Sequence, residues 1–547
     1  MKRLAAAVFA WAMCGLPASG ALAAAPAHAA DRAAFDRLFE QAMARYRLPG
    51  LAVGVIEDGR VAYVRAEGEL RAGGGEKIDA DTLFKIASNT KAMTAAVLAR
   101  LVDAGKLRWD DPVTRYLPQF RMHDPWVTRN LQVRDLLIHN SGLGLGAGDL
   151  MLWPEPNRFE RADIIAGLAH LKPTHSFRSH YAYDNLLYVV AGEVAARAGG
   201  KPYAQLVREE VFAPLGMRGC QVGAWDRDAV GNVAQPHMRQ GERNVVVRAD
   251  AARIPDTPSM AAGGVRCGLN DMLAWMRAWL APPPEQAAWL SPAQRQAVWT
   301  LHTPMPIPAQ MRQWEGTRMY GYGYGWRISD ADGQWKVAHT GTLMGMYSSL
   351  VLLPDRRSGF VILSNGEGGE MRTTLGAALT KRFTRPDQRA LDVEHYAALL
   401  ARERAHAARP DPARSAAAAR APATAAALRD RQGLWRDPWF GEVALCPQRG
   451  TLQFAARMSP LLRGQVMQAG GRWLVDWDDA SVDAEPWLDF ATAADGTQHM
   501  QLSHVDPDAD FSYDYADLDF VRAGPCPADP VDPVDPAGGA SAPAPGH

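Results

Sequence analysis

The sequence predicts an α+β fold: an antiparallel sheet flanked by helices, with an inserted helical region, followed by a small β-barrel-like domain. A hairpin pattern lies near the start of the chain, helical segments dominate from Ser88 to about Trp279, and strand-like runs return from Gly323. Strands at both ends of a helical middle imply one sheet with inserted helices. Beyond residue 430 short strand-like runs repeat, which is typical of a small barrel or sandwich.

The first two predicted strands are 51–56 and 61–64, which flank Asp58-Gly59. This dipeptide between two apolar runs is a strong signal for a tight β-hairpin. Later apolar runs are predicted to complete the sheet, at 323–328, 336–338, 349–353 and 360–363.

Residues 1–30 are predicted to be a secretory signal peptide. Lys2 and Arg3 give a positive start, a short apolar run extends from Leu4 to Leu16, and Ala21-Leu22-Ala23 or Ala27-His28-Ala29 gives a small-residue cleavage site. A transmembrane anchor, the alternative, needs about 20 consecutive apolar residues. We therefore expect a periplasmic or secreted protein with no integral membrane segment after cleavage.

Charge and length narrow the function classes. The 547 residues carry 59 Lys+Arg against 60 Asp+Glu, so no excess of either sign marks a nucleic-acid or membrane-surface partner. The length is enough for two domains at roughly 100–200 residues each. The sequence does not indicate an oligomeric state.

Removal of the signal peptide removes Cys14 and leaves Cys220, Cys267, Cys446 and Cys526. An oxidising compartment permits disulfides. Two cysteines fall in each predicted domain, so the pairs Cys220–Cys267 and Cys446–Cys526 are the simplest arrangement, with free buried thiols as the alternative. No Cys/His cluster has the spacing of a zinc site, and we expect neither a metal nor a cofactor.

Ser88-Asn89-Thr90-Lys91 places a hydroxyl and an amine at positions i and i+3, where a helix is predicted to begin. Such side chains share one face of the helix. A lysine amine within hydrogen-bond reach can accept the serine proton and create a nucleophile. The alternative is an ordinary helix cap at Ser88.

Two later tripeptides strengthen the catalytic interpretation. Tyr183-Asp184-Asn185 precedes an apolar helix-like run, and His339-Thr340-Gly341 lies between two strand-like runs. The order S-x-x-K, Y-x-N, [KH]-T-G resembles the serine β-lactamase and penicillin-binding-protein superfamily. The tyrosine motif is similar to the DD-peptidase, esterase and ampC-type branch. Similar segments in the expected order extend the resemblance over roughly residues 34–385: Leu136–Leu143, Pro214–Met217 and Met260–Val265.

The resemblance implies roles for four of these side chains. Ser88 would attack a carbonyl and form an acyl-enzyme. Lys91 or Tyr183 would accept its proton, and the sequence does not decide between them. Asn185 would hydrogen-bond both the substrate amide and Lys91.

The third motif would bind substrate. Thr340 would offer a hydroxyl to a substrate carboxylate, Gly341 would leave room for substrate, and the amides of Thr342 and Ser88 would form an oxyanion hole. His339 stands where β-lactamases most often have lysine, and its charge would be conditional near neutral pH. The histidine pattern is familiar among DD-peptidase-like and esterase-like relatives, so it disfavours an efficient β-lactamase.

The predicted domains are a serine hydrolase domain at 31–385, a helical and Ala/Pro-rich linker at 386–430, a β-rich domain at 431–526 and a Pro-rich tail at 527–547 that is not expected to fold. The β-rich domain resembles the lipocalin-like domain that follows the hydrolase domain in some relatives. Its predicted strands are 441–445, 452–454, 473–475, 487–490, 500–502 and 518–521.

The sequence thus predicts an exported serine hydrolase with a small-molecule or peptide substrate. It would act through an acyl-enzyme on amide or peptide bonds of D-amino-acid-type substrates or on small esters. The alternatives are a penicillin- or peptidoglycan-binding sensor module without turnover, or a weak β-lactamase.

Overall fold

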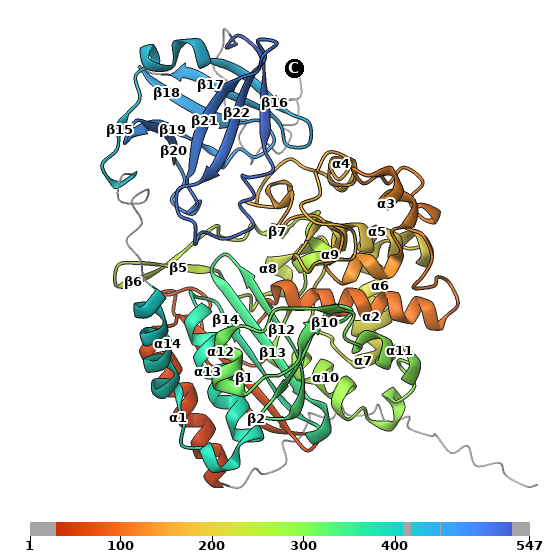
Figure 1. Ribbon diagram of the computed structural model, residues 1–547. Helices are drawn as coiled ribbons and strands as arrows, with labels where there is room; N and C mark the ends of the chain where they lie inside the picture. Colours follow the sequence, from red (N-terminus) through yellow and green to blue (C-terminus); the bar gives the residue numbers. More distant parts are fainter. Residues whose placement is uncertain (1–28, 408–416, 449, 528–547) are drawn as a thin grey trace, which may run out of the picture.

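The computed structural model describes residues 29–407, 417–448 and 450–527 (Figure 1). The predicted signal peptide, apart from its last two residues, and the predicted tail, apart from its first residue, lie outside these ranges. In the described part of the chain, every helix is too short or too polar to cross a membrane.

The domain that carries the three predicted motifs, called the catalytic domain below, is built on one antiparallel sheet of eight strands, in the order β2-β1-β14-β13-β12-β11-β10-β9. The N-terminal hairpin pairs with the last strand, so Val53 lies opposite Ile362. Its turn has positive φ at both Asp58 (48°) and Gly59 (78°), as a tight hairpin requires. The strands are β1 (Gly50–Glu57), β2 (Arg60–Gly68), β9 (Thr303–Pro304), β10 (Tyr320–Tyr322), β11 (Arg327–Ala331), β12 (Gln334–Leu343), β13 (Met346–Leu353) and β14 (Ser358–Ser364).

One predicted strand is divided. Of the run expected at 323–328, residues 323–326 form a turn between β10 and β11, and only residues 327–328 belong to a strand. Gly325 has a φ of +75° there, and a Cβ at this position would lie 2.5 Å from the carbonyl oxygen of Lys91. The turn therefore packs directly on the helix that carries Lys91.

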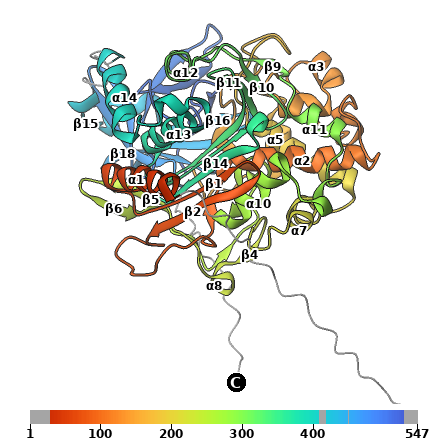
Figure 2. The same ribbon diagram turned by 90° about the horizontal axis from the view of Figure 1, so that it is seen from below.

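Helices α1 (Ala29–Tyr46), α13 (Gly369–Thr384) and α14 (Val393–Ala407) cover one face of the sheet (Figure 2). Alternate residues of β1 serve the two faces: Val53 packs with these helices and Ala52 with the other side. The sequence assigns α14 to the linker, but Tyr396 is 1% exposed and packs in the same cluster. Gln41 of α1 donates a hydrogen bond to Asp392 at 2.8 Å, so the catalytic domain extends through α14.

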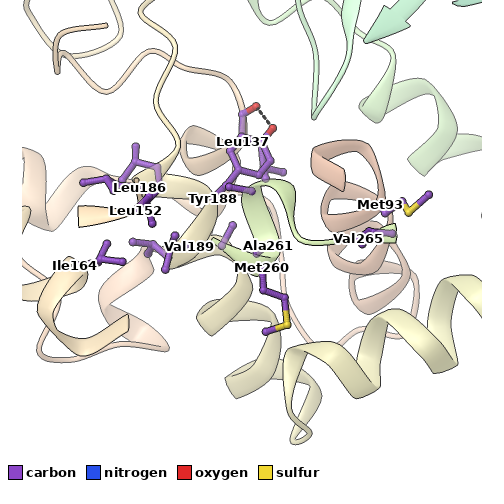
Figure 3. Close-up of a cluster of buried hydrophobic side chains, with 14 of the residues drawn as sticks. Met93, Leu137, Leu152, Ile164, Leu186, Tyr188, Val189, Met260, Ala261 and Val265 are labelled. Atoms are coloured by element: carbon purple, nitrogen blue, oxygen red, sulfur yellow. Dashed lines mark hydrogen bonds between the residues drawn. The ribbon is translucent and has the colours of Figure 1, made fainter. Parts of the chain in front are cut away.

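The inserted helices cover the opposite face and surround a central helix, α2 (Thr90–Asp103), which is buried on nearly all sides. Figure 3 shows part of the apolar cluster that holds them, in which Tyr188 donates a hydrogen bond to the Leu137 carbonyl at 2.7 Å. Because α2 is buried, its side chains reach the interior and not solvent. The other longer helices of this region are α4 (Arg161–Gly167), α5 (Leu186–Gly199), α10 (Leu269–Leu280) and α11 (Pro292–Val298).

The C-terminal domain is a closed antiparallel barrel of eight strands, because β16 pairs with β23 and β19 pairs with β20. The six predicted strands are present, and β16 and β19 are additional. A short strand from the predicted linker, β15 (Ala421–Pro422), pairs with β19. The barrel strands are β16 (Gly433–Asp437), β17 (Gly441–Gln448), β18 (Thr451–Ala456), β19 (Arg463–Ala469), β20 (Arg472–Trp477), β21 (Pro486–Thr492), β22 (Gln498–His504) and β23 (Asp519–Gly524).

The barrel lies above one end of the sheet, and the helical part of the catalytic domain reaches it near α4 (Figure 1). The rings of Phe159 and Phe440 are 5.8 Å apart, and the Arg158 amide donates to the Met458 carbonyl at 2.8 Å. Apolar residues of both domains belong to one continuous buried cluster.

Both predicted disulfides, Cys220–Cys267 and Cys446–Cys526, are confirmed. Cys267 lies in β8 (Arg266–Cys267), which pairs with β3 (Phe84–Lys85) three residues before Ser88. The first disulfide therefore anchors the segment that leads into the predicted nucleophile.

Candidate active site

Ser88 lies in a short 3-10 turn, η1 (Ala87–Asn89), immediately before α2. Ala87 has a φ of 48°, a conformation that residues other than glycine rarely adopt. Ser348 of β13 supports the turn: its hydroxyl donates to the Ile86 carbonyl and accepts from the Asn89 side-chain amide, both at 2.7 Å. The turn thus presents the Ser88 hydroxyl to a cavity of about 560 Å³.

Lys91 is completely buried. Its Nζ lies 3.4 Å from Ser88 Oγ, 2.7 Å from Asn185 Oδ1 and 2.9 Å from the Ala262 carbonyl oxygen. Burial in an apolar environment lowers the pKa of Lys91 to about 7. A substantial fraction of Lys91 is therefore neutral at neutral pH.

Tyr183 lines the same cavity as Ser88. Nζ of Lys91 is 4.8 Å from the centre of the Tyr183 ring. Burial raises the pKa of Tyr183 to about 12, so the phenol keeps its proton at neutral pH.

Asn185 connects Lys91 to a residue that the sequence did not single out. Its Oδ1 accepts from Lys91, and its Nδ2 donates to Asp149 Oδ2 at 2.7 Å. Asn185 precedes α5, but its side chain caps no backbone amide of that helix. The side-chain amide therefore hydrogen-bonds Lys91 and Asp149 and does not cap the helix.

The third motif lies inside β12, where the strand runs past the end of β11. The last β11–β12 pair is Arg327 with Ala338, so residues 339–343 pair only with β13, and Thr340, Thr342 and Leu343 line the cavity. A Cβ at Gly341 would lie 2.2 Å from the Ile86 carbonyl oxygen and 3.0 Å from Ala87 Cβ. Gly341 is therefore required for β12 to pack against the nucleophile turn, and not only to leave room for substrate.

His339 is fully buried and does not line the cavity. Its Nδ1 is 2.7 Å from the Thr340 carbonyl oxygen, which can only accept, so Nε2 accepts from the Tyr322 hydroxyl, also at 2.7 Å. Burial, and then the charges of Arg327 and Lys91, lower the pKa of His339 well below its usual value. The expectation of a conditional charge near neutral pH is therefore wrong, because a buried imidazole beside two cations stays neutral.

Two guanidinium groups that the sequence analysis did not identify lie beside the third motif. Arg327 donates to Thr340 Oγ1 at 2.9 Å. Arg372 of α13 donates to Thr342 Oγ1 at 2.9 Å and to the Gly341 carbonyl at 2.7 Å. Burial lowers the pKa of Arg372 to about 10, so it remains protonated. Neither residue belongs to a local motif, because one lies in a strand and the other in a distant helix.

The predicted site residues all lie at one cavity, either in its lining or directly behind it. Five of them line it directly: Ser88, Tyr183, Asn185, Thr340 and Thr342. Lys91, His339 and Gly341 lie behind this wall and contact its members.

The barrel also lines the cavity. Phe511 packs edge-on against Tyr183 with ring centres 5.8 Å apart, and the Ser512 hydroxyl donates to Asp149 Oδ2 at 3.0 Å. Asp483 and Asp510 lie at the same wall. No sequence signal connects these residues to the hydrolase motifs, because only the packing of the two domains brings them together.

Known proteins are similar to this chain in sequence and in fold. The family model described as Beta-lactamase matches residues 35–382. The D-alanyl-D-alanine-carboxypeptidase/endopeptidase AmpH of Escherichia coli is 30% identical over 239 residues, which are 42% of this chain and 57% of that protein. Esterase EstB of Burkholderia gladioli is 36% identical over 203 residues, 34% of this chain and 50% of that protein.

The chain thus spans between half and two thirds of these curated relatives. The solved structure of a penicillin-binding protein homologue from Pyrococcus abyssi covers 89% of this chain and 99% of its own, with a TM-score of 0.54 at 17% identity, and supports the fold alone. Since the family model covers more than half of the chain and the S-x-x-K, Y-x-N and H-T-G residues meet at one cavity, this protein belongs to the β-lactamase family of serine hydrolases.

Proposed function

We propose that this protein is an exported serine hydrolase that forms an acyl-enzyme on Ser88. Its substrates would be amides or peptides of D-amino-acid type, or small esters. The observation that carries the proposal is the hydrogen bonding of Lys91. A neutral amine has two N–H donors and one lone pair, and Asn185 Oδ1 and the Ala262 carbonyl can only accept. These two acceptors take both N–H groups and leave the lone pair for the Ser88 hydroxyl.

This arrangement favours Lys91 over Tyr183 as the base. With a pKa of about 7, Lys91 is available to accept a proton at neutral pH, whereas the pKa of Tyr183 is about 12. Ser88 attacks the carbonyl carbon as Lys91 takes its proton, and the amides of Ser88 and Thr342 stabilise the oxyanion. Tyr183 donates a proton to the leaving amine or alkoxide and regains one from Lys91. Water then attacks the acyl group and gives a proton to Lys91, which passes it to the Ser88 oxygen as the ester bond breaks, so the serine hydroxyl and the neutral amine are both restored.

The two guanidinium groups favour substrates that carry a carboxylate beside the scissile bond. Arg327 and Arg372 hydrogen-bond the hydroxyls of Thr340 and Thr342, and neither forms an ion pair within the described residues. Guanidinium and hydroxyl donors together suit a carboxylate well. The cavity also carries the carboxyls of Glu367, Asp483 and Asp510, which would favour a substrate with a cationic group further away.

Export is supported by two disulfides, which persist in oxidising compartments. It is also supported by the resemblance of residues 1–30 to a signal peptide. One relative is named as a D-alanyl-D-alanine-carboxypeptidase and another as an esterase, and both activities belong to the substrate classes proposed here.

Ser88→Ala is expected to abolish turnover and labelling by a fluorescent penicillin or a fluorophosphonate, because the Ser88 hydroxyl that contacts Lys91 is the proposed nucleophile. Hydrolysis of D-dipeptides, nitrophenyl esters and a β-lactam is measured for the wild type and the variant. Matching thermal melts would show that the variant is folded.

Residual activity within about tenfold of wild type would contradict the nucleophile assignment. A single stoichiometric burst with every substrate class, without later turnover, would favour the sensor over the hydrolase. Slow or negligible hydrolysis of the β-lactam is expected beside multiple turnovers of an ester or D-amide.

A further inference from the structure

We infer that Asp149 is a positioning residue for Lys91, and that Ser512 of the barrel completes the hydrogen bonding of Asp149. The barrel would then be a working part of the active site and not an appended module. The inference rests on the proposed function, in which Lys91 accepts the Ser88 proton.

The residues form one hydrogen-bonded chain that crosses between the domains. Lys91 Nζ donates to Asn185 Oδ1, Asn185 Nδ2 donates to Asp149 Oδ2, and Ser512 Oγ donates to the same Asp149 oxygen. An asparagine amide can be turned over by rotation, which exchanges its donor and its acceptor. Because Asp149 Oδ2 accepts from Asn185, it holds the Asn185 nitrogen away from Lys91 and the oxygen towards it.

The Asp149 carboxyl has no other hydrogen-bonding side chain among the described residues. It is fully buried, its Oδ1 has no hydrogen-bond partner, and Oδ2 receives only Asn185 and Ser512 from the side chains. A buried carboxyl is costly without hydrogen bonds. Ser512 therefore supplies one of two side-chain hydrogen bonds that stabilise the carboxyl in this position.

The catalytic domain is shaped to receive this part of the barrel. Gly146 has a φ of +71°, and a Cβ there would lie 2.5 Å from the Phe511 carbonyl oxygen. The Gly148 amide donates to Asp514 Oδ2 at 2.7 Å. On its other side, the Gly146 amide donates to the Tyr183 carbonyl at 2.8 Å. The segment 146–149 thus contacts the barrel with one side and the catalytic tyrosine with the other.

The test compares Asp149→Ala, Asp149→Asn, Ser512→Ala and the double variant Asp149→Ala/Ser512→Ala, with Ser503→Ala on barrel strand β22 as the matched control. Hydrolysis of a nitrophenyl ester is followed as kcat and KM. Asp149→Ala is expected to lower kcat about 10- to 100-fold with little change in KM. Asp149→Asn keeps an acceptor oxygen and should restore much of this loss. Ser512→Ala is expected to cost about threefold to tenfold, and Ser503→Ala less than about twofold.

The double variant separates positioning from general destabilisation. If Ser512 acts through Asp149, removing it costs nothing further once Asp149 is gone, so the double variant should match Asp149→Ala. If the losses of kcat in Asp149→Ala and Ser512→Ala multiply in the double variant, the inference is overturned. Full activity in both Asp149→Ala and Ser512→Ala would also overturn it. Ser512 is only partly buried, so Ser512→Ala is expected to fold. It can therefore test the inference even if Asp149→Ala does not fold.

A second readout needs no substrate. The titration of Lys91 is followed by NMR of its ¹³Cε signal, assigned with Lys91→Arg. Loss of the Asn185 oxygen as an acceptor for Lys91 Nζ should lower the Lys91 pKa in Asp149→Ala and, by less, in Ser512→Ala. An unchanged titration in both variants would overturn the inference. A wild type without turnover or labelling would instead count against the proposed function, while the titration still decides the coupling.

Discussion

Lys91 and His339 show how burial sets the charge of the active site. Both side chains are fully buried, and both have a pKa below their usual value because the charged form loses its hydration. For Lys91 this produces a base that is available near neutral pH. For His339 it produces a neutral imidazole that accepts a hydrogen bond from Tyr322. The cations of the cavity wall are therefore arginines, whose charge is permanent.

The pH dependence of acylation should follow Lys91. Because the neutral amine is the active form, kcat/KM should rise with pH through an apparent pKa of about 7 and level off above it. Since His339 is already neutral in this range, His339→Gln should leave the position of this limb unchanged, although it removes a partner of Tyr322. Rates measured for both proteins between about pH 5 and about pH 9, the range in which the enzyme is expected to stay folded, test this. Loss of the limb in His339→Gln would assign it to the histidine.

At the level of elements, the site depends on how closely strand β12 packs on turn η1. Gly341 is the point of contact, and the Ile86 carbonyl and the Ser348 hydroxyl occupy the space that a side chain would need. The strained Ala87 conformation lies at the same contact. The spacing between the third motif and the nucleophile is therefore set by backbone packing.

Gly341→Ala is expected to force β12 and η1 apart, destabilise the fold by about 1–3 kcal/mol and lower kcat about 100-fold. Gly376→Ala in α13 is the matched control, because a Cβ there would meet nothing within 4 Å. It should stabilise the helix by about 0.5–1 kcal/mol and leave turnover unchanged. Denaturant titration and steady-state kinetics measure both effects. A fully active Gly341→Ala would show that the contact is not needed.

Local patterns could predict those elements that have a strong period or a defined turn, as the hairpin around Asp58-Gly59 shows. They failed where residues distant in the sequence determine the local structure. The run 323–328 reads as a strand, yet Gly325 must turn there to pack on Lys91. Strand β19 carries Gln465 and Gln468 between its buried residues, and its pairing with β18 and β20 in the barrel makes it a strand.

The same distinction holds for the candidate site. The residues of the three motifs could be identified because each motif is a short local pattern, and the structure places them within reach of one another. Asp149, Arg372 and Ser512 could not be identified, because each is an ordinary residue locally. Their positions depend on the packing of a loop, a helix and a barrel against the cavity.

On the scale of the whole molecule, each domain has its own covalent link. Cys446–Cys526 joins strand β17 to the segment after β23, and Cys220–Cys267 joins the helical region to β8 beside the nucleophile segment. Such links stabilise mainly by restricting the unfolded chain. The two disulfides should therefore have similar effects on stability but different effects on activity.

Replacing either cysteine pair by serine is expected to lower the free energy of unfolding by roughly 2–4 kcal/mol. Cys220→Ser/Cys267→Ser should also reduce turnover, because β8 pairs with β3 just before Ser88. Cys446→Ser/Cys526→Ser should affect turnover less at temperatures where the barrel remains folded. Denaturant titrations and ester hydrolysis measure these effects, and alkylation of the unreduced, denatured wild type should find no free thiol. Four reactive thiols would contradict the prediction.

The bond between Ser512 and Asp149 also has a consequence for timing. Ser88 is synthesised early and Ser512 more than four hundred residues later, so the hydrogen-bonded chain behind Lys91 can close only when almost the whole described chain has emerged and the barrel has folded. A growing polypeptide would already contain all three motifs but would lack the support that holds Asp149. Full hydrolytic activity would therefore appear only after the barrel has folded onto the catalytic domain, and unfinished or truncated chains would be weak catalysts.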